Sequence, residues 1–132
     1  MEPYKYVSYD KKVCECIYGN GNENKKYDII HNIVSKSFCK KMINSGEEYA
    51  KKYTWTKKRH DNYPTTDNEV DNTWLEYDVL KKIVKNKIAP KINEMYNVDV
   101  NKIGINEIFI VKYDISGQRF LKYHEDGSEF SF

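Results

Sequence analysis

A histidine and an aspartate stand two residues apart in the stretch KYHEDGSEFSF at 122–132. Successive residues of an extended strand point to opposite faces, so His124 and Asp126 share one face while Glu125 points to the other. One neutral imidazole and one carboxylate are two of the three ligands of a 2-His-1-carboxylate site, which holds non-haem Fe(II). The third ligand would be a histidine on a distant strand. The alternative is a polar turn, because a Gly-Ser pair follows directly.

The other histidines and cysteines form no comparable pattern. Cys14 and Cys16 make a C-x-C, but no second pair completes a zinc site, so plain thiols are expected. His31 lies within an apolar stretch, where a structural role is the simpler interpretation. The basic and aromatic stretch TWTKKRHDNY at 54–63 is either a substrate-binding loop or a solvated loop.

The composition is typical of one folded domain. The chain has 132 residues, of which 32% are charged and 14% aromatic, and its formal net charge is +2. Because acids and bases are interspersed, we do not expect a nucleic-acid partner. The N-terminus has no signal peptide, and no run reaches the roughly eighteen apolar residues of a membrane span. Three cysteines without a signal peptide indicate reduced thiols. We therefore expect an intracellular protein, in the cytoplasm or in a virus-infected host.

Three regions position the candidate site. Residues 1–34 are a variable lead-in of strands and loops, with one strand expected at 27–34. Residues 35–97 are predicted to be helical: a serine caps the first helix, and a loop at 54–71 contains a short strand near 65–70. An apolar stripe then recurs at three and four residues, so we expect an amphipathic helix with a core-facing side. Pro90 should kink this helix or start another.

Strands are expected in the third region, 104–132. The stretch INEIFIVKYD is rich in β-branched and aromatic residues and predicts a buried strand. QRFLKYHED predicts a second strand, and SEFSF opens a third after the Gly-Ser turn. Helices followed by consecutive strands predict an α+β fold, with the helices packed on one side of an antiparallel sheet.

The C-terminal stretch resembles the start of the double-stranded β-helix (jelly roll) of Fe(II)- and 2-oxoglutarate-dependent dioxygenases. The pattern is most similar to the catalytic domain of procollagen lysyl hydroxylases, with prolyl 4-hydroxylases next. Tyr113 ends a strand and precedes His124 by the lysyl hydroxylase interval. Upstream, NYPTTD at 62–67 resembles the Pro-Thr-x-Asp segment before the long helix of those enzymes, and Pro90 matches a proline in that helix. Gly-Gln at 117–118 resembles the pair before the metal histidine of prolyl 4-hydroxylases.

The resemblance implies a chemistry and its cofactors. His124 and Asp126 would be the first two iron ligands, and Tyr113 would line the 2-oxoglutarate pocket or, alternatively, be a core tyrosine. Iron and 2-oxoglutarate together would activate oxygen to hydroxylate a C–H bond and release succinate, with ascorbate as reductant. The substrate would be a lysyl or prolyl side chain of a protein or peptide. A collagen-like chain is one such substrate.

The family motif continues to a distal histidine and a basic residue that pairs with the cosubstrate, and neither can be placed here. We therefore expect the chain to be the N-terminal part of a longer dioxygenase domain, cut after the H-x-D strand and inactive alone. Two other functions stay open: a non-catalytic binding or scaffold module derived from such an enzyme, and a small basic nucleic-acid-binding domain.

Overall fold

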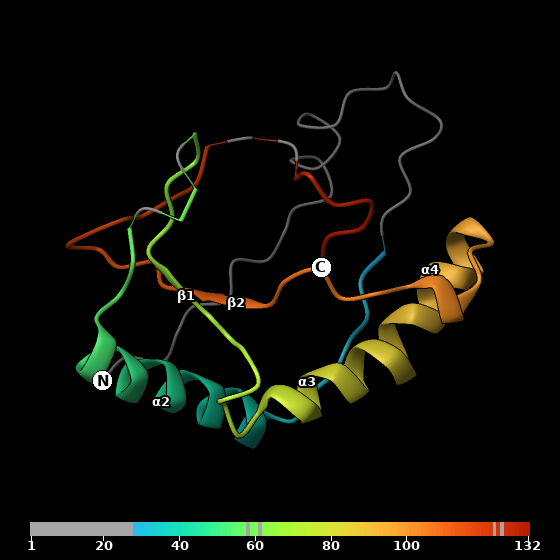
Figure 1. Cartoon of the computed structure of the whole chain (residues 1–132), viewed down its shortest axis with the longest axis horizontal. Helices are drawn as coiled ribbons and strands as arrows, with labels where there is room; N and C mark the ends of the chain where they lie inside the picture. The colour runs from blue at the N-terminus through green and yellow to red at the C-terminus, as the bar shows by residue number, and fades with distance from the viewer. Residues whose placement is uncertain (1–27, 58, 61, 123, 125) are drawn as a thin grey trace. The chain divides into compact units, whose positions relative to one another are not determined.

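The structure is a computed structural model that describes residues 28–57, 59–60, 62–122, 124 and 126–132 (Figure 1). Two units divide the chain, Met1–Ile30 and His31–Phe132, and the described helices and strands belong to the second. The lead-in predicted at 1–27, with Cys14 and Cys16, lies outside the described residues.

Helix α2 spans Lys36–Tyr53, as the capping pattern predicts. The Ser35 hydroxyl accepts a hydrogen bond from the Phe38 amide at 3.1 Å, which satisfies one of the free amides of the first turn. Gly46 is the buried residue of this helix, and a Cβ there would lie 3.1 Å from Cδ1 of Ile110. The glycine therefore allows the helix to approach the strand that carries Ile110.

The sheet has two antiparallel strands, β1 (Asp67–Glu69) and β2 (Phe109–Val111), in the register Asp67↔Val111 and Glu69↔Phe109. Backbone hydrogen bonds continue the pairing at both ends, from Val70 to Ile108 and from Lys112 to Thr66, each at 2.8 Å. Helix α2 lies along this pair of strands (Figure 1). The expected α+β class is confirmed at this level.

The second helical stretch changes its winding where the proline lies. Helix α3 covers Tyr77–Ile83, a π-helical turn covers Val84–Ile88, and helix α4 covers Ala89–Tyr96. Pro90 has no amide hydrogen and its ring clashes with the carbonyl four residues earlier. The wider π turn removes this conflict, since the Ala89 amide bonds to the Val84 carbonyl, five residues back. The predicted kink is thus a change of helical pitch.

The apolar stripe of this stretch forms the core, as predicted. Val84, Ile88 and Ile92 are buried together, and half-buried side chains from both directions along the chain pack against them. These are Ile33, Ile83, Ile103, Ile105 and Phe130. A short 3-10 turn, η2 (Val100–Lys102), links α4 to the segment before β2.

A buried carboxylate fixes the position of β1. Asp67 is fully buried and accepts hydrogen bonds from the hydroxyls of Thr65 and Thr56. Nε of Arg59 lies 2.9 Å from Oδ1 of Asp67. This contact is an ion pair without a hydrogen bond, because the N–H is not aligned with the oxygen. The same guanidinium contacts Glu69 of β1 and Glu107, so it joins the loop before β1 to that strand and to the segment that enters β2.

Several predicted strands are absent from the described residues. Residues 31–34 form a turn and bends where a strand was expected. The described residues of 118–126 and 128–132 form neither strand, and no jelly roll is present in the described part of the chain. Strand β2 is also less buried than expected, with Phe109 40% exposed. Alternation predicts a strand only where an apolar partner covers one face, and Ile115 and Phe120 remain 82% and 70% exposed.

Removal of the buried charge should destabilise the protein far more than removal of its exposed neighbour. In Asp67→Asn, Arg59 loses its buried partner, and we expect unfolding in urea to require about 3 kcal/mol less. Glu69→Gln removes another carboxylate that pairs with Arg59, but the Glu69 side chain is 60% exposed. This change should lower the free energy of unfolding by under about 1 kcal/mol. Equal losses in the two variants would contradict the structural role given to Asp67.

Candidate functional site

The side chains of His124 and Asp126 meet. Nε2 of the histidine lies 3.1 Å from Oδ1 of the aspartate, and the two side chains are 24% and 51% exposed. They lie on irregular chain, so the predicted strand is not what brings them together. The expected convergence of the two groups is nevertheless present, with both open to a ligand from solvent.

The other ring nitrogen of His124 determines what Nε2 can do. Nδ1 lies 2.8 Å from the carbonyl oxygen of Lys122, and a carbonyl can only accept, so Nδ1 carries a hydrogen. In the neutral ring Nε2 then has a lone pair directed at a carboxylate oxygen. Two electron-rich atoms at this distance need a cation between them, either a proton or a metal ion. A backbone carbonyl behind the ring is also the usual partner of a metal-binding histidine.

The spacing of the two atoms fits a metal ion. Ligand atoms about 2.1 Å from a metal and at right angles to each other lie about 3 Å apart, close to the observed 3.1 Å. Nitrogen and carboxylate oxygen are the donors that Fe(II) takes in such sites. Within the described part of the chain no group of three His, Cys, Asp or Glu side chains could hold a metal, so this site has two protein donors there.

The remaining histidines lie elsewhere. Nε2 of His60 is 3.8 Å from the buried carboxylate of Asp67, and its ring is tilted against Phe109 with centroids 5.5 Å apart. His31 is exposed in a turn. Neither belongs to the pair formed by His124 and Asp126.

Tyr63 is the residue that the sequence did not assign to the site. Its ring stacks on the imidazole of His124, with centroids 4.8 Å apart and planes at 27°. The tyrosine comes from the loop before β1. It ends the stretch 54–63, for which a substrate-binding loop is one interpretation, and it belongs to the motif NYPTTD that resembles a family pattern. No local signal in the sequence links a tyrosine at 63 to a histidine at 124.

Gln118 ties these two distant segments together. Its Oε1 accepts from the Thr66 amide at 2.5 Å, and its Nε2 donates to the Pro64 carbonyl at 2.9 Å and to the Phe120 carbonyl at 3.3 Å. One side-chain amide therefore satisfies backbone groups on both sides. It holds the loop that carries Tyr63 against the segment that leads to His124.

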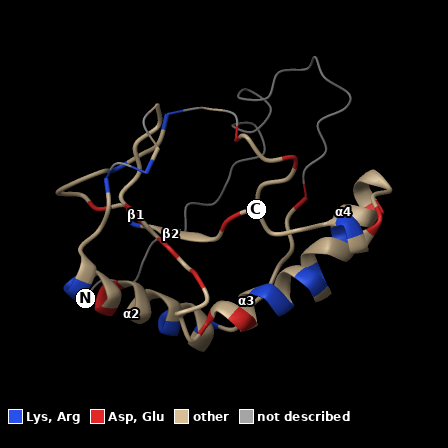
Figure 2. Cartoon of the chain, in the orientation of Figure 1, with Lys and Arg blue, Asp and Glu red and all other residues tan. Residues whose placement is uncertain are grey.

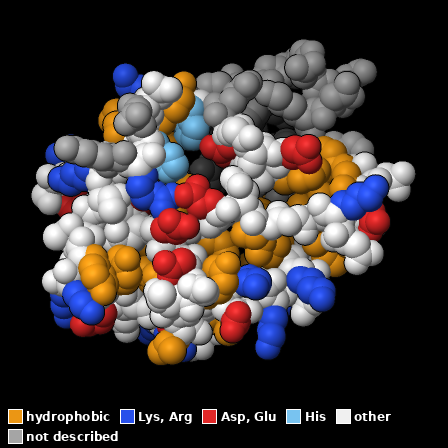
Figure 3. All heavy atoms as spheres, viewed as in Figure 1, with side chains coloured by type: hydrophobic (Ala, Val, Ile, Leu, Met, Phe, Trp, Pro, Cys, Tyr) orange, Lys and Arg blue, Asp and Glu red, His pale blue; other side chains and the backbone are white. Residues whose placement is uncertain are grey.

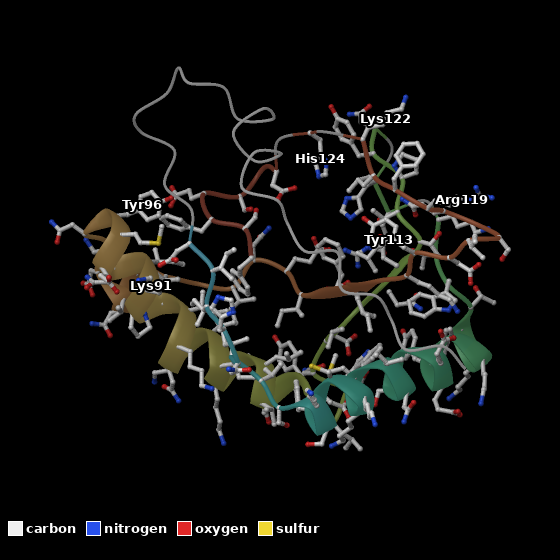
Figure 4. All side chains as sticks on the ribbon, turned by 180° about the vertical axis from the view of Figure 1, so that it is seen from behind. Lys91, Tyr96, Tyr113, Arg119, Lys122 and His124 are labelled. Atoms are coloured by element: carbon white, nitrogen blue, oxygen red, sulfur yellow. The ribbon has the colours of Figure 1, made fainter. Side chains whose placement is uncertain are left out.

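Tyr113 lies just beyond β2 and is 50% exposed. It lines a small hollow of about 260 Å³ together with Asp114, Ile115 and Arg119. His124 does not line this hollow. Figure 4 shows Tyr113, Arg119, Lys122 and His124 along the segment that follows β2. The assignment of Tyr113 to 2-oxoglutarate stays a prediction.

A larger hollow of about 520 Å³ lies between the loop before β1 and the segment after β2. Its lining consists of Asn62, Tyr63, Pro64, Gly117, Gln118, Arg119, Phe120, Leu121 and Lys122. Tyr63 is therefore shared: it is part of this hollow and also the stacking partner of His124. A molecule bound in the hollow would lie beside the histidine.

The turn that begins the segment after β2 is held by a carboxylate. The amide and hydroxyl of Ser116 donate to Oδ1 of Asp114, and the Asp114 amide donates to the Gln118 carbonyl at 2.8 Å. The hydrogen bond from the Ser116 hydroxyl is the main reason why the pKa of Asp114 lies below its ordinary value of 3.8. The charged form of Asp114 thus stabilises the turn that places Gln118.

The stretch 54–63 is more structural than its composition suggests. Arg59, one of its cations, turns inward to Asp67 and is 18% exposed. Trp55 lies under the ammonium group of Lys112, 5.6 Å from the ring centroid. The sequence allowed either a substrate-binding loop or a solvated loop. The described residues show a further role, because this stretch braces the strand pair.

Comparisons with protein-family models, curated proteins and solved structures found no match for this chain.

Replacement of Tyr63 should distinguish stacking from simple proximity. Tyr63→Phe keeps the aromatic face and should leave the ring-proton shifts of His124 in NMR spectra nearly unchanged. Tyr63→Leu removes the face, so these shifts should move downfield and the free energy of unfolding should fall by about 1 kcal/mol. Identical His124 shifts in both variants would show that the rings do not stack in solution.

The lowered pKa of Asp114 gives a pH prediction with a defined sign. Because the folded pKa lies below 3.8, the contribution of this carboxylate is complete above pH 3.8 and is lost as the pH falls through the folded value. In Ser116→Ala the pKa should rise toward 3.8, measured by NMR titration of the carboxyl carbon.

Asp71 provides the internal control for this titration. Its pKa is also lowered, chiefly by a hydrogen bond from the Thr73 hydroxyl, so it should not respond to the Ser116 change. A pKa of Asp114 that stays the same in the Ser116 variant would contradict the assignment.

Proposed function

We propose that this chain supplies His124 and Asp126 as two iron ligands of a 2-oxoglutarate-dependent dioxygenase that hydroxylates a protein side chain. The observation that carries the proposal is the contact of Nε2 with Oδ1 at 3.1 Å, with the opposite ring nitrogen already bound to a carbonyl. This arrangement presents a lone pair and a carboxylate to one cation. The resemblance of the sequence to lysyl and prolyl hydroxylases indicates which cation and which chemistry.

The finer fold belongs to the same proposal. The segment from β2 onward would be the start of a double-stranded β-helix, in which further strands cover residues that are now exposed. The exposed apolar side chains of Ile115 and Phe132 are consistent with such a cover. The third ligand and the basic residue for the cosubstrate would come from those strands.

The residues of this chain have separate tasks in the proposed reaction. Bound iron and 2-oxoglutarate supply the oxidising equivalent that converts a C–H bond into a hydroxyl group, with ascorbate as reductant. His124 and Asp126 hold one side of the metal. The Lys122 carbonyl and the Tyr63 ring fix the plane and the tautomer of the histidine. Tyr113 would hydrogen-bond the cosubstrate, and the substrate would be a lysyl or prolyl residue of a protein chain.

An alternative is that His124 and Asp126 form an ordinary ion pair in a non-catalytic binding module. A protonated imidazole gives the same contact without a metal. A nucleic-acid-binding function is less favoured, because the formal net charge is only +2 and helices α3 and α4 carry acidic as well as basic residues (Figure 2).

Titration with Mn(II), a stable substitute for Fe(II), tests the proposal directly. We expect weak but saturable binding by the chain, followed by the EPR signal of free Mn(II). Asp126→Asn and His124→Ala should each weaken it by about tenfold or more, because each removes one of the two donors. His60→Ala and Asp78→Asn, which change a histidine and an exposed aspartate of α3 outside the pair, should bind Mn(II) like the unmodified chain.

The cosubstrate provides a second readout. If 2-oxoglutarate binds the same metal ion as His124 and Asp126, it should tighten Mn(II) binding. Mn(II) should then tighten 2-oxoglutarate binding by the same factor. Tyr113→Phe should reduce this coupling and leave Mn(II) binding alone unchanged. Mn(II) binding that is equal in the His124 and His60 variants would reject the metal site and favour the ion-pair alternative.

A further inference from the structure

The hollow between the loop 62–64 and the segment 117–122 has the size and walls of a binding site. Its volume of about 520 Å³ lies within the usual range of ligand pockets. Pro64, Phe120 and Leu121 give it apolar walls, to which the Tyr63 ring adds an aromatic face. Phe120 is 70% exposed, so much of its apolar surface is open to a ligand.

Two cations line the same hollow. Lys122 forms no ion pair within the described residues, and Arg119 uses its Nε to donate to the Ile115 carbonyl at 2.8 Å. The terminal nitrogens of that guanidinium have no acidic partner in the described part of the chain. The nearby acids are engaged elsewhere, Asp114 with Ser116 and Asp126 with His124. Among the described residues, the hollow therefore combines apolar walls with two cations that no acidic side chain pairs.

Part of the wall also has backbone amides without a partner among the described residues. Between residues 119 and 122 no amide N–H donates a hydrogen bond to any described group. The carbonyls of Phe120 and Lys122 are already used, by Gln118 and His124 respectively. Free amides beside an apolar hollow suit the carbonyl groups of an extended polypeptide, the arrangement by which a peptide adds to a strand edge.

We propose that this hollow binds an acidic peptide segment, with an apolar side chain in the hollow and a carboxylate at Arg119 and Lys122. The inference rests on the proposed function in one respect: the segment would be the part of the protein substrate that flanks the hydroxylated residue. Tyr63 makes the connection, since it lines the hollow and stacks on His124. A peptide held there would pass beside the metal-binding pair.

The same features favour a peptide over a nucleic acid. A single-stranded nucleic acid needs a row of cations that follows its phosphates, whereas this hollow offers two. The face of the molecule in Figure 3 carries acidic as well as basic side chains. The free amides offer donors that match peptide carbonyls.

Fluorescence anisotropy with a labelled peptide that alternates glutamate and phenylalanine tests the inference. The glutamine version of the peptide should bind about fivefold more weakly, the effect of losing exposed charge pairs. Lys122→Glu should weaken binding of the glutamate peptide by about tenfold, and Phe120→Ser should weaken both peptides. Lys85→Glu makes the same charge reversal on the π turn, away from the hollow lining, and should leave binding unchanged.

Binding measured in EDTA separates this inference from the proposed function. The glutamate peptide should bind without metal, so failure of the Mn(II) experiments would leave the peptide site standing. Equal affinity for the glutamate and glutamine peptides would overturn the inference. So would equal effects of the Lys122 and Lys85 reversals, or tighter binding of a single-stranded oligonucleotide than of the peptide.

Discussion

A fully buried carboxylate, Asp67, is the constraint on which the rest of the described structure depends. A charge without water is unstable unless other groups satisfy it, and here two hydroxyls and a guanidinium do so. Because those groups come from the loop before β1, the loop must fold back over the strand. Arg59 then extends the same constraint to the segment that enters β2, through Glu107. The pairing of the two short strands is thus fixed by charge as much as by backbone hydrogen bonds.

The proposed site inherits its geometry from this arrangement. The segment that enters β1 presents its backbone to Gln118, and Gln118 holds the chain beyond β2 against it. Tyr63 and His124 come into contact only because these two segments are held together. His124 and Asp126 therefore lie on irregular chain that the strand pair braces, and not on a strand. A site of this kind is positioned by a few polar contacts, so a single substitution at one of those contacts would displace His124.

The helices and the two short strands were predictable from the sequence, since β1 lies within the strand expected near 65–70 and β2 within the one expected at 105–114. The long-range contacts and the absence of further strands from the described residues were not. Ser35 and the stripe through Val84, Ile88 and Ile92 are local signals with helical spacing, and both appear where they were expected. Pro90 predicted a change in the helix, but only the structure shows the π turn that accommodates this proline. Strand signals at 118–132 depended on partners that the described residues do not provide. The burial of Asp67 joins residues that are close only in space, which spacing along the chain cannot reveal.

The central claim is that His124 and Asp126 hold one metal ion, and the direct coupling of that ion to an imidazole nitrogen tests it best. Electron spin echo envelope modulation of the Mn(II)-loaded chain should show a nitrogen coupling from a directly bound imidazole. This coupling should vanish in His124→Ala and persist in His60→Ala. A spectrum without nitrogen coupling, or one that His60→Ala abolishes, would contradict the account, because the 3.1 Å contact would then be an ion pair alone.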